Sequence, residues 1–238
     1  AMFKSMTESL AIPHFSFKDE VVVDEVIKAR TQINESLNRK PIDGLTKISI
    51  MPFLIKAASL ALASYPILNT RVVMTADDNP QLLYRSSHHI SIAMDTSRGL
   101  VTPVIKDVQA KSIIEIARDL ARLQKAGQAN TLTLGDMSDG TFSLSNIGVI
   151  GGTYLFPVIV SSQVCIGAVG KIQRLPRFEQ VVADHAVGHS EERVVAKHIM
   201  VTSWSADHRV IDGATLARFV REFKQYIESP AIMLAHLH

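Results

Sequence analysis

The chain has 238 residues, which is long enough for one large domain or two small ones around a sizeable buried core. Its formal net charge of +2 does not indicate binding to nucleic acid or to an anionic membrane, and no apolar run is long enough to span a bilayer. The single cysteine, Cys165, excludes an internal disulfide, and its apolar neighbours predict a buried, unreactive thiol.

The N-terminal part of the chain predicts an extended arm followed by two helices. Residues 1–16 show no strong helical period, so we expect an extended arm there. Apolar residues at helical spacing over 24–37 predict an amphipathic helix. A second run, apolar almost all round, begins near Pro52 and is stopped at Pro66, which predicts a buried helix.

The middle of the chain predicts short strands separated by turns. The strands are expected at residues 71–75, 82–85, 90–94 and 101–105. Ser112 is the expected N-cap of a third helix that reaches Gln124. The adjacent His88 and His89 have no further ligand at a suitable spacing, so no metal site is predicted.

The second half begins with a predicted strand over Thr141–Asn146. The glycines of the following Gly148–Gly152 stretch lack the lysine and hydroxyl of a phosphate loop, so close backbone packing is expected of them. The polar stretch 179–196 predicts a surface hairpin. The apolar end, 230–238, is too short for a core of its own, and either docks into a neighbour or packs back on its own subunit.

We find no internal repeat, low-complexity run or domain boundary, so residues 1–238 are predicted to form a single domain. Strands and helices mix without a regular strand-helix-strand alternation. This pattern indicates an α/β fold in the two-layer sense, a sandwich of a mixed β-sheet and helices.

The most informative stretch is Ser205–Gly213, which lies between a β-rich segment and a helical pattern. His208 should therefore sit in a turn between strand and helix, as expected of a positioned general base or of a hydrogen-bonded structural histidine. Asp212, four residues on, could cap the helix or orient the histidine loop. Gly213 is expected to let the backbone turn.

A second stretch, Gly140–Gly148, carries Ser145 and Asn146. Together the two stretches resemble the acyltransferase core of the E2 components of 2-oxo acid dehydrogenase complexes. That family has a histidine-x-x-x-aspartate-glycine signature and an upstream serine-asparagine strand. The resemblance covers nearly all of the chain and implies a fold like that of chloramphenicol acetyltransferase. Three segments are most similar to the branched-chain member: residues 12–15, 51–53 and 203–209.

The resemblance implies that an acyl group, branched-chain in type, moves between dihydrolipoamide and coenzyme A. A thiol with a pKa near ~8.5 is mostly protonated at neutral pH, and neutral His208 would take its proton as the sulfur attacks. Ser145 would donate a hydrogen bond to the tetrahedral oxyanion. Without the resemblance, a strand serine bonded to its own backbone would be the favoured interpretation of Ser145. Asp207 and Arg209 are expected to form a structural ion pair or solvent contacts.

The resemblance also implies contacts with coenzyme A. The matching residues are Arg30, Ser49, Asp95, Gln124, Asn146 and Gly170. For Arg30 and Gln124, a solvated helix face remains an equal alternative. No metal is implied, and lipoate must arrive on a separate domain, because no lysine here lies in a recognisable lipoylation hairpin.

The family builds homotrimers in which the serine and the histidine of one site come from different chains. The trimers assemble into a cubic core of about 24 copies or a dodecahedral core of about 60 copies. E1 decarboxylase and E3 dihydrolipoamide dehydrogenase would bind through lipoyl and subunit-binding domains that this chain lacks. The location implied is the mitochondrial matrix, or else a bacterial cytoplasm. No targeting segment begins the chain, and an excised domain would have lost one.

Two rival functions stay open at this point. An O-acetyltransferase of the chloramphenicol type would share the histidine signature and the trimeric fold. A non-catalytic scaffold core would only assemble the complex, but it would not need both His208 and Ser145.

Overall fold

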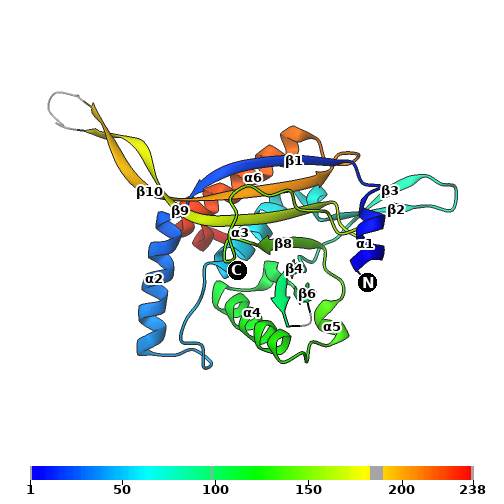
Figure 1. The fold of residues 1–238 in the computed structure, drawn as a ribbon, viewed down its shortest axis with the longest axis horizontal. Coiled ribbons are helices and arrows are strands. Elements are labelled where there is room, and N and C mark those ends of the chain that lie inside the picture. The colour runs from blue at the N-terminus through cyan, green and yellow to red at the C-terminus, as the bar shows by residue number, and fades with distance from the viewer. Residues whose placement is uncertain (1, 98, 183–189, 237–238) are drawn as a thin grey trace.

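The computed structural model describes residues 2–97, 99–182 and 190–236 as a mixed β-sheet with helices packed on one face (Figure 1). The helices are α1 (Met2–Ser9), α2 (Asp24–Arg39), α3 (Met51–Ser64), α4 (Ile113–Gln128), α5 (Leu134–Met137) and α6 (Gly213–Glu228), with 3-10 turns η1 (Pro66–Asn69), η2 (Val108–Ala110) and η3 (Pro230–His236). The strands are β1 (His14–Val22), β2 (Thr70–Met74), β3 (Pro80–Tyr84), β4 (Ile90–Ile92), β5 (Met94–Thr96), β6 (Gly99–Val101), β7 (Val104–Ile105), β8 (Phe142–Asn146), β9 (Cys165–Val182) and β10 (Ser190–Asp207).

The main sheet has the strand order β1-β10-β9-β8-β4-β7. Strand β8 runs parallel to both β9 and β4, whereas the β1–β10, β10–β9 and β4–β7 pairs are antiparallel. Two small two-stranded sheets, β2-β3 and β5-β6, lie outside it. The predicted two-layer α/β sandwich with a mixed sheet is confirmed. Within the described residues, no helix is both long and apolar enough to cross a membrane.

Aromatic packing fixes α6 on the sheet. The Trp204 ring of β10 makes edge contacts with Phe219 and Phe223 of α6, at centroid distances of 5.3 and 5.0 Å. The same ring covers Gly167 of the neighbouring strand β9, where an added Cβ would lie 2.3 Å from Trp204 Cζ3. A sheet residue without a side chain therefore makes room for the largest ring of the core.

Helix α3 is the buried helix that the sequence predicts, with Pro52 in its first turn. It carries one buried cation, Lys56, whose ammonium donates to the carbonyls of Val108 and Gln109 at 3.3 and 3.1 Å. Burial lowers the pKa of Lys56. These hydrogen bonds tie η2, and with it the start of α4, to the centre of the molecule.

The expectation of an extended arm over residues 1–16 is wrong for residues 2–9, which form α1. Tertiary contacts hold this helix: the Ser9 hydroxyl donates to the carbonyl of Ile159 at 2.6 Å, and Ser161 donates to Glu8 at 3.0 Å. A two-turn helix is marginal by itself, so its existence depends on partners that are distant in the sequence.

The β9–β10 hairpin protrudes beyond the sheet (Figure 1). The two arms pair in register, with Phe178 opposite Val194, as the predicted hairpin over 179–196 requires. Residues 183–189 lie outside the described residues.

The C-terminal turn η3 packs back on its own chain through the buried side chain of Met233, whereas Leu234 is 68% exposed. Residues 237–238 lie outside the described part of the chain.

The contact between Gly167 and Trp204 generates a stability prediction. Gly167→Ala should lower the free energy of unfolding by about 1–3 kcal/mol, because the new methyl group overlaps the indole. Urea unfolding followed by fluorescence of the single tryptophan measures the change. Gly135→Ala in α5, where an added Cβ meets only the Thr133 hydroxyl at 3.6 Å, is the matched control. Equal stability of the two variants would contradict the packing argument.

Candidate active site

His208 follows the end of β10 and exposes its ring to solvent. Its backbone N–H donates to the carbonyl of Pro13 at 2.9 Å, and its Nδ1 lies 3.0 Å from the carbonyl oxygen of Ile211. Because a carbonyl can only accept, Nδ1 must carry the ring proton in this contact. Nε2 of the neutral ring therefore keeps a free lone pair, which is what a general base needs.

The turn around His208 is braced by an ion pair between buried Asp207 and half-exposed Arg209. Asp207 is 1% exposed, and its carboxylate accepts from Arg209 Nε at 2.9 Å and from an Arg209 terminal nitrogen at 2.6 Å. The hydrogen bond from the guanidinium to Asp207 raises the pKa of Arg209. Of the two alternatives for these residues, the structural ion pair is the one observed, and it fixes the backbone on both sides of the histidine.

Asp212 is the N-cap of α6. Its carboxylate accepts from the Thr215 hydroxyl at 2.6 Å and from the Thr215 backbone N–H at 2.9 Å, and these bonds lower the pKa of Asp212. The capping alternative is therefore the one observed, and the backbone carbonyl of Ile211, not Asp212, bonds the His208 ring. A direct part for Asp212 in catalysis stays a prediction.

Gly213 has a different role from the one expected. It is the first residue of α6 and does not adopt a positive φ, so the backbone does not need glycine for a turn. An added Cβ would instead lie 2.9 Å from Cζ of Phe15 in β1. The Phe15 ring in turn lies against the imidazole of His208, with a centroid distance of 4.9 Å. The glycine therefore makes room for this ring.

Ser145 lies near the end of β8, level with Ala168 of β9 and, through it, with Ser203 of β10. Within the described residues its hydroxyl has no hydrogen-bond partner, so the alternative of a backbone-bonded serine is not observed. His208 lies past the far end of β10. At about 3.3 Å per residue, the two side chains of one chain are roughly 15 Å or more apart. One chain does not bring them together.

Several residues predicted to contact coenzyme A gather near the end of β8. Asp95, Gln124 and Asn146 line one cavity of about 320 Å³, and Asn146 and Gly170 line another of about 220 Å³. Ser49 lies just before α3, where its hydroxyl accepts from the backbone N–H of Met51, a residue that lines the first cavity. Gln124 is exposed and also lines the first cavity, so both alternatives for it stay open and its binding role stays a prediction.

Arg30 of α2 is predicted to bind coenzyme A but lines neither of these cavities. Its Nε is buried and has no hydrogen-bond partner among the described residues. A buried donor without a protein acceptor is uncommon in folded proteins, and an ordered water, an ion or a ligand can satisfy it. A negatively charged ligand such as a phosphate would fit this donor.

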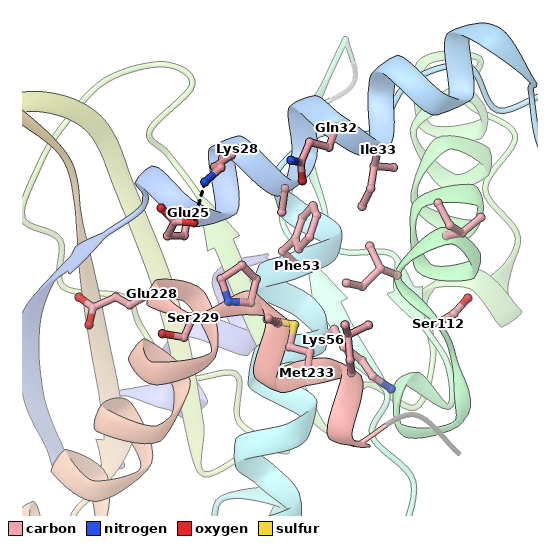
Figure 2. Close-up of a pocket in the computed structure, with 16 residues that line it drawn as sticks. Glu25, Lys28, Gln32, Ile33, Phe53, Lys56, Ser112, Glu228, Ser229 and Met233 are labelled. Atoms are coloured by element: carbon pink, nitrogen blue, oxygen red, sulfur yellow. Dashed lines mark ion pairs between the residues drawn. The ribbon is translucent and has the colours of Figure 1, made fainter.

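A larger cavity, of about 720 Å³, lies between α2, α3, the start of α4 and η3 (Figure 2). Its walls are mostly apolar, with Phe53 and Met233 among them and the Glu25–Lys28 ion pair at one side. None of the predicted site residues lines it. It is therefore not the candidate active site, and it lies beside the C-terminal segment.

The adjacent histidines are structural in the fold. Burial lowers the pKa of His88 to about 4, and its Nδ1 lies 2.8 Å from the Ser59 hydroxyl. His89 Nδ1 accepts from the backbone N–H of Asp107 at 3.0 Å. Across the part of the chain that is described, no group of three or more histidine, cysteine or acidic residues could hold a metal ion.

Comparison with known proteins decides the family. The family model "2-oxoacid dehydrogenases acyltransferase (catalytic domain)" matches residues 1–235. The chain belongs to this family. It is 49% identical over its whole length to the lipoamide acyltransferase component of the mitochondrial branched-chain α-keto acid dehydrogenase complex of Caenorhabditis elegans, and 48% identical to that of Bos taurus. It covers 49% and 46% of these two proteins, so the chain spans about half the length of the curated relatives it matches.

Solved structures agree with this assignment. Dihydrolipoamide acetyltransferase of Azotobacter vinelandii, studied for the roles of a serine, a histidine and an asparagine in its mechanism, superposes with a TM-score of 0.84 at 25% identity. The match covers 98% of this chain and 88% of that one. Chloramphenicol acetyltransferase superposes with a TM-score of 0.52 at 13% identity over 90% of this chain and 86% of the other. The expected likeness of fold is confirmed.

Sequence reasoning missed two parts of the site. Phe15 belongs to the Ile12–Phe15 segment that carries part of the resemblance, yet an aromatic residue in a strand gives no sign that it lies beside a histidine almost 200 positions away. The Ile211 carbonyl is a backbone group and leaves no trace in the residue type.

The cap at Asp212 generates a prediction that separates its two roles. Asp212→Ala should lower the melting temperature, because two donors at the start of α6 lose their acceptor, whereas Asp212→Asn should keep most of the stability. Differential scanning calorimetry of both variants at neutral pH measures this. An equal loss for Asn and for Ala would show that the charge, and not the cap, matters.

Proposed function

We propose that this domain transfers an acyl group between dihydrolipoamide and coenzyme A, with His208 as general base. The observation that carries the proposal is the hydrogen bond from His208 Nδ1 to the Ile211 carbonyl, which leaves Nε2 free to accept a proton. Membership of the family, with the 49% identity to a lipoamide acyltransferase, supports the choice of substrates.

The reaction requires only one proton acceptor and one oxyanion donor from the protein. Nε2 of His208 takes the thiol proton while the sulfur attacks the carbonyl carbon of the thioester. The resulting oxyanion accepts a hydrogen bond from Ser145, whose hydroxyl is uncommitted in the described structure. The intermediate then collapses, the second sulfur leaves, and His208 returns the proton to it.

The site is completed by a second copy of the chain. His208 and Ser145 are far apart in one chain, so the histidine of one copy must meet the serine of the next. The loop after β8 offers a surface for this contact, because it follows Ser145 and crosses the sheet face opposite the helices, where Leu155 N–H donates to Ser203. The exposed large apolar residues of this loop are Ile147, Val149, Ile150, Tyr154, Phe156 and Val158. A homotrimer built this way would bring the two side chains together at each boundary between chains.

We also infer that trimers join into a larger core, of about 24 copies in the cubic arrangement. The cubic core of a pyruvate dehydrogenase multienzyme complex superposes on this chain with a TM-score of 0.84. The apolar cavity beside η3 and exposed Leu234 are available for contacts between trimers (Figure 2). E1 and E3 enzymes would join such a complex through other domains.

The relatives support a proposed substrate class and location. Lipoamide acyltransferases of the branched-chain complex from Caenorhabditis elegans, Bos taurus and Mus musculus are 48–49% identical, whereas acetyltransferases of the pyruvate complex from Rickettsia are 35% identical. A branched-chain acyl group and the mitochondrial matrix are therefore the proposed substrate and location. The six predicted residues around the end of β8, before α3 and on α2 would hold coenzyme A.

The Azotobacter vinelandii enzyme bears on Asp212. Its investigated asparagine follows the investigated histidine by four positions, the spacing between His208 and Asp212 here. Asparagine and aspartate are equally good helix N-caps, so a capping role is compatible with the residue found in each protein. A role that needs a negative charge is compatible only with aspartate. This supports an indirect role for Asp212.

The catalytic assignments predict the activity of two variants. His208→Ala should abolish transfer of an isovaleryl group from coenzyme A to dihydrolipoamide, and Ser145→Ala should lower kcat by about 10²–10³-fold. Stopped assays with each purified variant measure this, with light scattering as the control for assembly. Retained turnover by intact His208→Ala particles would contradict the base assignment, and transfer to chloramphenicol instead would favour the rival acetyltransferase.

Sharing of the site between chains predicts complementation. When His208→Ala and Ser145→Ala chains are coexpressed, random mixing in a trimer should restore about one quarter of the sites. Each variant expressed alone provides the background rate. If both residues served one site within a single chain, no mixed particle would recover activity.

A further inference from the structure

Phe15 occupies a closed position between two residues of the histidine signature. It is the second residue of β1, opposite Ala206 of β10 in the antiparallel ladder. One face of its ring approaches the His208 imidazole, with a centroid distance of 4.9 Å and an interplanar angle of 33°. Another part of the ring lies over Gly213, where any Cβ would meet Cζ at 2.9 Å. The ring is therefore wedged between the base and the first residue of α6.

The strand that carries Phe15 is fixed on both sides. His14 Nδ1 donates to the Ile12 carbonyl at 2.7 Å, and His14 Nε2 accepts from the backbone N–H of Ile159 at 3.0 Å. The Pro13 carbonyl accepts from the backbone N–H of His208 itself. Phe15 thus belongs to a segment that is bonded directly to the catalytic turn, and it has little freedom to move away from the imidazole.

The imidazole needs such a neighbour. Its ring is exposed and, within the described residues, is held by one hydrogen bond, from Nδ1 to Ile211. A turn of the ring by about 180° about the Cβ–Cγ bond would exchange Nδ1 with Cδ2. Nδ1 would then lose the Ile211 carbonyl, Nε2 would leave the position from which it faces the substrate, and no acceptor would keep the ring proton on Nδ1. A flat aromatic face against the imidazole restricts this rotation.

We propose that Phe15 is a positioning residue for the reaction: its ring, seated on Gly213, holds the His208 imidazole in the orientation in which Nδ1 donates to Ile211 and Nε2 faces the substrate. This inference rests on the proposed function of His208 as the base. It also assigns a reason to the glycine of the signature, which is the space that the positioning ring requires.

The test compares two phenylalanines of the same strand. Phe15→Leu should lower kcat roughly 10-fold or more, because a misoriented base is costly, with little change in KM for coenzyme A. Phe17→Leu is the matched control: Phe17 lies two positions along on the same face, is also half-buried against the core, and pairs with Trp204. It should keep activity within about 2-fold of the parent. Phe15→Tyr, which keeps the aromatic face, should restore most of the loss.

A second readout reports the orientation of the ring without reference to activity. Solid-state NMR of sedimented particles containing ¹⁵N-histidine distinguishes the two neutral tautomers, and the His208 signals are identified by their loss in His208→Ala. The parent should show the Nδ1–H tautomer, and Phe15→Leu should show a mixture with the Nε2–H form. An unchanged tautomer in Phe15→Leu, or an equal loss of kcat in both leucine variants, would overturn the inference. An active His208→Ala enzyme would overturn the proposed function, whatever the tautomer result.

Discussion

The hydrogen bond from His208 Nδ1 to the Ile211 carbonyl is the constraint on which the chemistry proposed for this domain depends. A free imidazole exchanges its proton between two nitrogens, and only one of the two forms presents a lone pair at Nε2. The backbone carbonyl selects that form without introducing a charge. The Asp207–Arg209 ion pair and the cap at Asp212 then fix the turn on either side. The tautomer is therefore selected by a backbone carbonyl and not by a second titratable side chain.

The strand register decides the rest of the site. Strands β8 and β9 run in parallel, so Ser145 stands level with Ala168, while the antiparallel return of β10 carries His208 past the opposite end. No side-chain rotation closes a gap of several residues along a sheet, at about 3.3 Å per residue. On the proposed roles of Ser145 and His208, the pair needs two chains, and the exposed apolar loop after β8 offers a surface for the second chain.

The sequence predicts features that are encoded by a few neighbouring residues, but it does not predict contacts between residues far apart in the chain. The buried helix α3, the Ser112 cap of α4 and the turn that holds His208 are encoded within a few residues, and each is found as predicted. Helix α1 was missed because its hydrogen bonds reach residues near Ile159. Gly213 and Gly167 both interrupt apolar patterns in the sequence. In the structure, the missing side chain of Gly213 leaves room for the Phe15 ring, and that of Gly167 leaves room for the Trp204 ring. Such pairings become visible only when strands that are distant in the sequence are brought together.

The distance between His208 and Ser145 in one chain also leaves both side chains accessible to water, and this relates assembly to the proposed catalysis. In one chain the His208 ring is exposed and the Ser145 hydroxyl is only half-buried, so water competes for both. A hydrogen bond to a developing oxyanion stabilises it most where water is excluded and the donor is already in place. On the proposed arrangement, the chain contact supplies both conditions at once, since the surface that delivers the base also covers the oxyanion donor. A single chain would then hold the base in its correct tautomer and still lack the environment in which that tautomer is effective.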